Sequence, residues 1–432
     1  MKRVVVTGIG IVSPLGIGAK THFDRLLAGD VAIDRIKSFD PSGFACQLGG
    51  EVPAYKINDF VPKSYRKATK VMARDIELAV IAADEAFKDA GLKSKAYADP
   101  AEINGLRFGC NIGAGLISAD LTELAQAMAP ARGPGDTLDL KKWGTEGMAQ
   151  LTPLWLLKYL PNMLACHVTI IHGLMGPSNT ICCDAASSHL AIGEAFRTIQ
   201  RGKADYAICG GAESRVNPMG IMRQQLVGRL NTTSNDDPAH AVRPFAKDAA
   251  GTVFGEGGGL FILEEYEHAA ARGATIYAEI VGFAASMDAY AVTEPDPSGH
   301  SYGKAVENAL RDAELSPADV NLLIPHASGH APGDAAELNG IAKGFGDHAT
   351  KIPVAPGKAQ YGSLAAGCGV DAATAVLSMR AGVVPPAVNS GAQTDGPTLN
   401  VSPTAREAKI NVAVSTVCSL GGQNAALVFK RV

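Results

Sequence analysis

The sequence predicts an α/β protein built from two similar halves. Forty-eight glycines and 24 prolines among 432 residues indicate many tight turns between short elements. Short β-branched or apolar runs alternate with segments of helical periodicity along the whole chain. Each half also carries a Gly-Gly pair after a late strand, Gly210-Gly211 and Gly421-Gly422, which suggests an internal duplication. We therefore expect parallel sheets with helices on both faces.

Eight short apolar runs are predicted to be strands, and in chain order they cover residues 4–6, 108–112, 180–183, 206–209, 261–263, 278–281, 322–324 and 412–414. Four segments with apolar residues every three to four positions are predicted to be helices, over residues 68–90, 189–199, 301–312 and 333–340. The polar segment 133–151 is expected to be an excursion from the first half. We place the boundary near residue 250, which gives domains 1–250, with the excursion inside 105–165, and 251–432.

Composition argues against several classes of protein. The formal net charge is −4 and the sequence pI is about 6.2, so neither nucleic acid nor an anionic membrane is an expected partner. No apolar run approaches the ~20 residues of a membrane span, and the first one is expected to be a strand and not a signal peptide. The eight cysteines lack zinc-type spacing, and buried free thiols are expected at Cys110, Cys166 and Cys209. A cytoplasmic location is expected, because the cytoplasm keeps thiols reduced.

The most informative motif is a catalytic turn that lacks its nucleophile. Residues 183–193 read Cys-Asp-Ala-Ala-Ser-Ser-His-Leu-Ala-Ile-Gly. This run resembles the active-site turn of β-ketoacyl synthases, T-A-C-[AST]-S-[SG]-x-x-A-I-G, in which the cysteine carries the acyl group. Alignment on the two ends of the motif places Ala185 at the position of that cysteine. A methyl group cannot form a thioester, so we do not expect ordinary condensation by this chain alone.

The resemblance to elongating β-ketoacyl synthases extends over the whole chain. Similar blocks lie at residues 5–16, 162–165, 210–213, 243–245, 254–259 and 263–274, in the family's order and spacing. The resemblance implies an α/β, thiolase-like fold of five layers, α-β-α-β-α, made of two similar halves. It also implies an obligate dimer.

In this family two histidines and a lysine assist the cysteine, which lies at a helix N-terminus. The resemblance assigns His326 to the first histidine and Lys358 to the lysine, whereas Ser363 occupies the position of the second histidine. Leu420 occupies the position of a phenylalanine that gates the site. Loss of members of a catalytic unit commonly lowers the rate by factors of about 10³ or more, so condensation should be abolished.

The retained polar residues also have structural interpretations. His326 is expected to be a leftover that hydrogen-bonds a core group, and His330 is expected on a surface loop. Lys358 needs an acidic neighbour if it is buried. The family's glutamate position corresponds to Ala372, with Asp371 beside it, so this lysine is either paired anew or more solvated.

Other polar residues of the motifs are expected to be structural. Cys183 is interpreted as a buried strand thiol and not as a displaced nucleophile. His167, His172 and His189 lie in apolar surroundings, where satisfied core histidines are commoner than ligands. The run 255–259 lacks the spacing of a dinucleotide loop and is expected to be a tight turn. No spacing of carboxylates and histidines predicts a metal site.

The losses at the elbow are similar to those of the chain-length factor, or ketosynthase-β, of type II polyketide and polyene systems. That resemblance implies a heterodimer with a cysteine-bearing ketosynthase, in which the inactive chain bounds the acyl tunnel. Leu116, Trp155, Met163 and Leu420 are then candidate tunnel or interface residues, and the apolar run 155–160 is expected at the dimer interface. The chain needs no cofactor of its own, because the phosphopantetheine of an acyl carrier protein reaches the complex through the partner.

Three other functions remain open from the sequence. The first is a malonyl-carrier decarboxylase or priming protein that uses His326 and Lys358. It is less supported, because chain-length factors often carry glutamine at the nucleophile position and Ala185 cannot mimic a carboxylate. The second is a homodimeric acyl-binding or scaffold protein. The third is an acyltransferase whose nucleophile is one of three serines, Ser187, Ser188 or Ser363.

Overall fold

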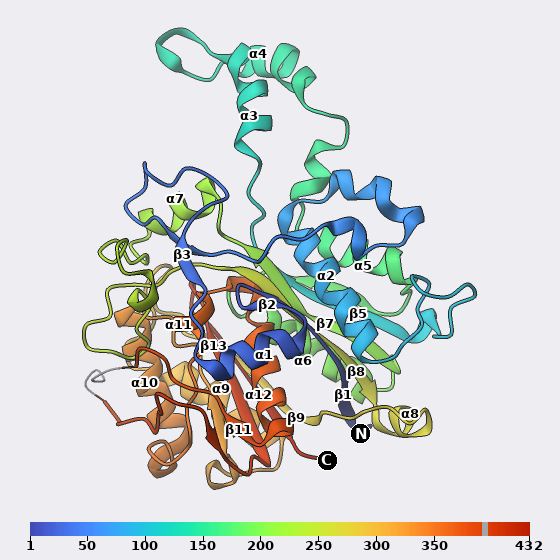
Figure 1. Ribbon diagram of the computed structural model, residues 1–432, viewed down its shortest axis with the longest axis vertical. Helices are drawn as coiled ribbons and strands as arrows, with labels where there is room; N and C mark the ends of the chain where they lie inside the picture. Colours follow the sequence, from blue (N-terminus) through green and yellow to red (C-terminus); the bar gives the residue numbers. More distant parts are fainter. Residues whose placement is uncertain (391–395) are drawn as a thin grey trace.

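The computed structural model describes residues 1–390 and 396–432, and a ten-stranded sheet forms its centre (Figure 1). In spatial order the strands are β10 (Leu322–Ile324), β13 (Val412–Cys418), β14 (Gln423–Lys430), β9 (Ala278–Met287), β1 (Val4–Ser13), β8 (Glu256–Glu265), β7 (Tyr206–Ser214), β5 (Phe108–Ala114) and β6 (Ser178–Ile181). The short β2 (Gly16–Ile17) pairs with β1. Two small hairpins lie outside this sheet, β3 (Ile33–Arg35) with β4 (Leu48–Gly50) and β11 (Val383–Val384) with β12 (Arg406–Glu407).

The sheet is mixed, so the expectation of parallel sheets is wrong. β5 is parallel to β6 and to β7, and β10 is parallel to β13. The pairs β1–β8, β7–β8, β1–β9, β9–β14 and β13–β14 are antiparallel. The last pair is a hairpin, in which a tight turn after Cys418 reverses the chain and forces the antiparallel arrangement.

Helices cover the strands in separate layers. The helices are α1 (Ala19–Ala28), α2 (Arg74–Asp89), α3 (Leu121–Met128), α4 (Leu140–Lys142), α5 (Met163–His172), α6 (Ser187–Gln200), α7 (Pro218–Leu226), α8 (Tyr266–Ala271), α9 (His300–Asp312), α10 (Ala331–Phe345), α11 (Lys358–Tyr361) and α12 (Gly369–Ala381). α2 and α5 pack on one face of the first-half strands, and α6 and α12 pack between the two sets of strands. α9 packs against β9 and β14, and α10 packs against α9. This order of layers confirms the predicted α/β, thiolase-like fold.

Most predicted elements overlap elements of the same type. The eight predicted strands fall in β1, β5, β6, β7, β8, β9, β10 and β13, although β6 ends at Ile181. The helix predicted over 68–90 is a 3-10 helix, Lys63–Val71, followed by α2. The sequence missed α12, because almost every residue of this helix is buried and it therefore has no polar face that would give a helical period.

The glycine run 255–259 is not a tight turn, contrary to expectation. Gly257, Gly258 and Gly259 lie inside β8. A Cβ atom on Gly259 would lie 2.4 Å from the backbone carbonyl carbon of Gly369, at the start of α12. These glycines therefore let the central helix approach the strand closely, a role that the sequence does not distinguish from that of a turn.

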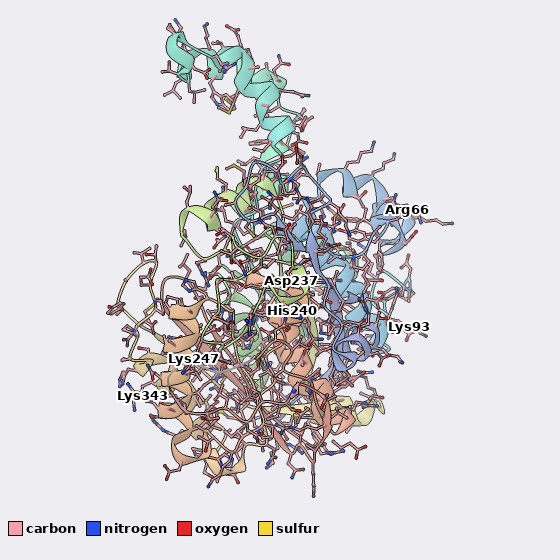
Figure 2. The ribbon with its side chains drawn as sticks, turned by 60° about the vertical axis from the view of Figure 1, so that its left-hand side comes forward. Arg66, Lys93, Asp237, His240, Lys247 and Lys343 are labelled. Atoms are coloured by element: carbon pink, nitrogen blue, oxygen red, sulfur yellow. The ribbon has the colours of Figure 1, made fainter. Side chains whose placement is uncertain are left out.

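Residues 115–162 form an arm that leaves the sheet after β5 and carries α3 and α4 away from the body (Figures 1 and 2). The run 155–160 forms a 3-10 helix, Trp155–Tyr159, near the base of the arm. This arrangement agrees with the excursion expected from the sequence. Exposed apolar side chains are unusually frequent on the arm: Leu116, Leu121, Met128, Leu138, Leu140, Met148, Leu154 and Leu156.

The division into domains at residue 250 stays a prediction. β8, which follows that boundary, lies between β1 and β7 of the first half. Within the described residues, every helix is too short or too polar to cross a bilayer.

Candidate active site

The vacated elbow lies between β6 and the N-terminus of α6. Asp184 has a left-handed backbone, with φ 48°, and Ala185 follows it with only 3% of its surface exposed. The methyl group of Ala185 packs in an apolar cluster with Cys368, Val417 and Ala425. The positive end of the α6 dipole faces this turn and would lower the pKa of a thiol there. The side chain present has no group that can ionise.

The two serines of the elbow are already hydrogen-bonded. Ser187 Oγ accepts from Cys183 N at 2.8 Å and donates to Asp184 O at 2.7 Å. Ser188 Oγ donates to the carbonyl oxygen of Ala366. Within the described structure neither hydroxyl is hydrogen-bonded to a histidine or a carboxylate side chain, so neither has a base that would activate it as a nucleophile.

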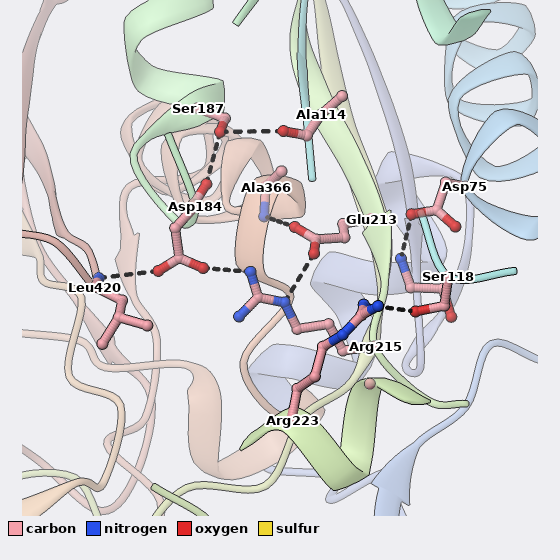
Figure 3. A network of polar contacts seen from close by, with 12 residues as sticks. Asp75, Ala114, Ser118, Asp184, Ser187, Glu213, Arg215, Arg223, Ala366 and Leu420 are labelled. Atoms are coloured by element: carbon pink, nitrogen blue, oxygen red, sulfur yellow. Dashed lines mark hydrogen bonds and ion pairs between the residues drawn. The ribbon is translucent and has the colours of Figure 1, made fainter. Parts of the chain in front are cut away.

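Asp184 anchors an ionic network that sequence reasoning missed (Figure 3). Its Oδ1 pairs with the guanidinium of Arg215, which also donates from Nε to Glu213 Oε1 at 2.7 Å. Its Oδ2 accepts from Leu420 N at 3.0 Å and lies 3.9 Å from Arg229 Nη1. Burial alone would raise the pKa of Asp184, but the charges of the two arginines outweigh burial and hold it well below its usual range. The sequence signal that could have revealed this network is Asp184 itself, a charged residue directly before Ala185.

His326 lies in the core with an unsatisfied ring, contrary to the expected hydrogen bond to a core group. It is 3% exposed, and neither ring nitrogen has a hydrogen-bond partner in the described structure. Burial, followed by the charge of Lys358, lowers the pKa of His326 well below its ordinary value, so the ring is neutral. Its backbone N–H and that of Ala327 donate to the carboxylate of Glu337, each at 2.7 Å, which fixes the loop.

A cavity of about 40 Å³ adjoins His326. Its lining includes Arg229, Ser328, Cys418 and Leu420. His330 also lines this cavity and is half-buried, so the expectation of a surface-loop histidine is wrong, because α10 begins beside it and draws the loop inward.

Lys358 is paired anew, which was one of the two outcomes expected. Its Nζ lies 2.6 Å from Asp371 Oδ2, and the hydroxyl of Tyr361 donates to the other oxygen of the same carboxylate. Burial lowers the pKa of Lys358, but the charge of Asp371 outweighs burial and the pKa stays above its ordinary value. The acidic partner therefore comes from the residue before the family's glutamate position.

The serine at the second histidine position is held by the backbone. Ser363 N donates to Val253 O at 2.8 Å, and Ser363 O accepts from Gly255 N at 2.9 Å. The residue is buried, with only 3% of its surface exposed. A hydroxymethyl group here lacks the imidazole N–H that would stabilise an enolate.

A second, larger cavity of about 1190 Å³ lies at the base of the arm. Its lining includes Met72, Arg74, Asp75, Ser118 and Tyr159. Three of the four predicted tunnel residues lie near its lining residues in sequence but not in the lining: Leu116 is 65% exposed, and Trp155 and Met163 are half-buried. The fourth, Leu420, lines the smaller cavity.

The remaining histidines and cysteines have structural surroundings. Each of the three core histidines has one ring nitrogen in a hydrogen bond: His167 with Tyr65, His172 with Ser94 and His189 with Ser415. In the described structure the other ring nitrogen of His167 and of His189 is buried without a partner, so the expectation of satisfied rings is wrong for these two. Cys183 is half-buried and lies beyond the end of β6, so the prediction of a buried strand thiol is wrong. Over residues 1–390 and 396–432 there is no group of three or more His, Cys, Asp or Glu residues that could hold a metal ion.

Family models and curated relatives match most or all of the chain. The family model of the β-ketoacyl synthase N-terminal domain matches residues 1–269, and that of the C-terminal domain matches residues 277–391. The 3-oxoacyl-[acyl-carrier-protein] synthase 2 of Synechocystis sp. is 35% identical over 432 residues, which is 100% of this chain and 98% of that protein. The enzyme of the same name from Vibrio harveyi is 33% identical over 434 residues, covering 100% and 99%.

Three solved structures are similar to this chain over its full length. A β-ketoacyl synthase from Burkholderia phymatum STM815 has a TM-score of 0.85 at 28% identity, with full coverage of both chains. The ishigamide ketosynthase/chain length factor has a TM-score of 0.86 at 25% identity, covering 100% of this chain and 99% of that one. A type II PKS acyl-carrier protein in complex with its ketosynthase has a TM-score of 0.83 at 27% identity, again with full coverage. The chain therefore belongs to the β-ketoacyl synthase family.

Proposed function

We propose that this chain is the non-condensing subunit of a two-subunit ketosynthase and acts as its chain-length factor. The observation that carries the proposal is the methyl group of Ala185 at the elbow, where the family places its nucleophile. Ser363, at the second histidine position, removes a further catalytic group. A cysteine-bearing partner would then perform the chemistry, and this chain would bound the space available to the acyl group.

Two surfaces support pairing with a second subunit. One of the two edge strands of the sheet, β6, has a paired strand on one side only, and Ser178 and Asn179 in it are exposed. An open strand edge of this kind is a template for pairing with another chain. The arm adds leucines such as Leu140, 74% exposed, which would be unfavourable in water unless a partner covered them.

The large cavity supports a role in limiting chain length. It opens at the base of the arm, between Tyr159 and α2, so a subunit docked on the arm would close it into an internal space. An acyl chain that met a side chain in such a space would be overpacked, which costs about 1–3 kcal/mol. That penalty is enough to stop elongation by a further unit.

A cationic surface supports contact with an acyl carrier protein. Lys63, Arg66, Lys67 and Lys70 are exposed on the 3-10 helix Lys63–Val71, and in the described structure none of them makes an ion pair. Arg66 lies on the outer surface in Figure 2. Four unpaired cations in one short helix attract an anionic partner. The carrier's phosphopantetheine group is itself anionic.

Native mass spectrometry of this chain co-expressed with a cysteine-bearing synthase encoded beside it tests the proposal. We expect a 1:1 heterodimer, and poor solubility of this chain when it is expressed alone. A matched variant, Leu138→Gln/Leu140→Gln, should fold but pair less, because both leucines are exposed. A stable homodimer that does not bind the synthase would overturn the proposal.

One observation favours a second function, a malonyl-carrier decarboxylase or priming protein. Both ring nitrogens of His326 lack partners, and Lys358 remains in place behind it. The test is to incubate the purified chain with malonyl-carrier protein and to measure acetyl-carrier protein and CO₂. Release of both by the chain alone, lost in His326→Ala, would replace the first proposal by this one.

A further inference from the structure

The turn that joins β13 to β14 is hydrogen-bonded to the elbow. Gly422 N donates to Ser419 O at 3.0 Å, and Ser419 N donates to Gln423 O at 2.9 Å, so residues 419–422 form a compact turn. The backbone N–H of Leu420, at the tip, donates to Asp184 Oδ2 at 3.0 Å. The residue directly before the vacated position therefore holds the turn in place.

The fastening is stronger than a single hydrogen bond between neutral groups. Asp184 is ionised and pairs with Arg215, which is itself fixed by Glu213, and Glu213 Oε2 accepts from Ala366 N at 2.9 Å (Figure 3). A carboxylate that accepts from a backbone N–H makes a charge-assisted bond, about twice as strong as a neutral one. The network thus ties the turn to β7 and to the segment before α12.

The tip of the turn, at Leu420 and Gly421, could open if this bond were absent. Gly421 and Gly422 have φ angles of 89° and 88°, a region that glycine visits without strain. A Cβ atom on Gly421 would meet nothing within 4 Å, so packing does not hold the tip. The end of the turn is fixed separately, because Gly422 O accepts from Asp288 N at 2.8 Å and a Cβ atom on Gly422 would lie 2.8 Å from Asp288 Cβ. In the observed position, Leu420 and Ser419 line the cavity beside His326, which has a volume of only about 40 Å³. A few water molecules fit there, but the chain of atoms of a pantetheine thioester does not.

We propose that Asp184 is a specificity-determining residue that keeps the turn 419–422 closed and so excludes carrier-bound thioesters from this chain's own elbow. This inference goes beyond the proposed pairing, because it concerns the access path within one chain and holds with or without a partner. Asp184 then has a function of its own: it blocks access to the elbow at Ala185, which also lacks its nucleophile.

A thiol reporter tests the closure directly. Ala185→Cys places a thiol at the elbow, and its alkylation by iodoacetamide is followed by mass spectrometry of the peptide that contains position 185. We expect alkylation about tenfold or more faster in Ala185→Cys/Asp184→Ala than in Ala185→Cys, which is the effect of losing one charge-assisted bond. Removal of a neighbouring carboxylate also changes the thiol pKa. The rate constants are therefore compared on the alkaline plateau, where the thiol is fully ionised.

The matched control is Asp205→Asn in the same thiol background. Asp205 also pairs with an arginine, Arg107, at 2.8 Å, but it lies at the start of β7, away from the turn. This control should leave the alkylation rate unchanged.

Hydrogen exchange on the otherwise unchanged protein gives an independent measurement. In Asp184→Ala, or in Asp184→Asn if the alanine variant does not fold, the amide of Leu420 should lose about tenfold in protection. The amides of β13 and β14 should keep theirs, which distinguishes opening of the turn from unfolding. Equal alkylation rates together with equal Leu420 protection would overturn the inference. This outcome does not depend on whether the chain pairs with a synthase.

Discussion

The ammonium group of Lys358 lies 2.6 Å from the carboxylate of Asp371, and the two side chains are only 1% and 2% exposed. The pair joins α11 to α12 directly behind the candidate site. Tyr361 donates to the second carboxylate oxygen, so Asp371 is satisfied on both sides. The lysine is therefore part of the core. Its presence at the family's lysine position does not by itself indicate catalysis.

Removing one member of this pair should destabilise the protein strongly. Lys358→Met leaves an uncompensated buried carboxylate, and breaking a buried pair in this way costs about 3–5 kcal/mol. Lys358→Met/Asp371→Asn should lose less than the single variant, because no buried charge remains. Urea unfolding of the three proteins measures the difference. A double variant less stable than Lys358→Met would contradict this account.

Restoring the thiol alone should not restore condensation. Ala185→Cys supplies a nucleophile at the N-terminus of α6, yet Ser363 still lacks the second imidazole and the turn at Leu420 still closes the site. The test supplies acyl-carrier and malonyl-carrier proteins to the purified variant and looks for the 3-oxoacyl product by mass spectrometry. Product formed at a rate comparable with that of a cysteine-bearing synthase would refute the prediction.

Sequence reasoning located the elbow, the histidine loop and the lysine, because each lies in a contiguous motif with fixed spacing. It could not find Arg215 or Arg229, since these residues reach Asp184 only through the fold, 31 and 45 positions away along the chain. An almost fully buried helix also escaped prediction, because its sequence lacks a distinguishing pattern. The helix α12 is buried on all sides, so its sequence carries no amphipathic period.

The close contact of β1 with α2 makes a glycine substitution informative. A Cβ atom on Gly10 would lie 1.9 Å from the carbonyl oxygen of Ala82 in the helix backbone. Gly10→Ala should therefore force the two elements apart and lower the free energy of unfolding by about 1–3 kcal/mol. Gly43→Ala, where a Cβ meets nothing within 4 Å, should change it by less than about 0.5 kcal/mol. Similar melting curves for the two variants would argue against this packing.

Asp75, in the wall of the large cavity, should make stability depend on pH. Burial, with added repulsion from Glu213, raises the pKa of Asp75 to about 7. The folded protein therefore holds this proton until about pH 7, whereas the unfolded chain releases it near pH 4. The contribution of this group to stability is complete below pH 4 and is lost as the pH rises through 7.

The variant Asp75→Asn isolates that contribution, because its amide oxygen can still accept from Ser214 N. Relative to the native chain, the variant should gain about 2–3 kcal/mol in unfolding free energy between pH 5 and pH 8. An offset for Asp75→Asn that stays constant over this range would show that the carboxyl is already ionised at pH 5.

Leu116 should control product length if this chain bounds the acyl space of a pair. It lies two residues after the end of β5, at the root of the arm, and is 65% exposed, so a docked subunit would cover it. Leu116→Trp adds volume at that surface, and the extra ring should stop elongation at a shorter chain, because overpacking opposes each added unit. Leu106→Trp is the control: this leucine is 68% exposed but precedes β5, at the opposite end of the strand. Products of the reconstituted pair are sized by mass spectrometry, and native mass spectrometry checks that both variants still pair. If both variants pair and both give products of native length, Leu116 does not line the tunnel.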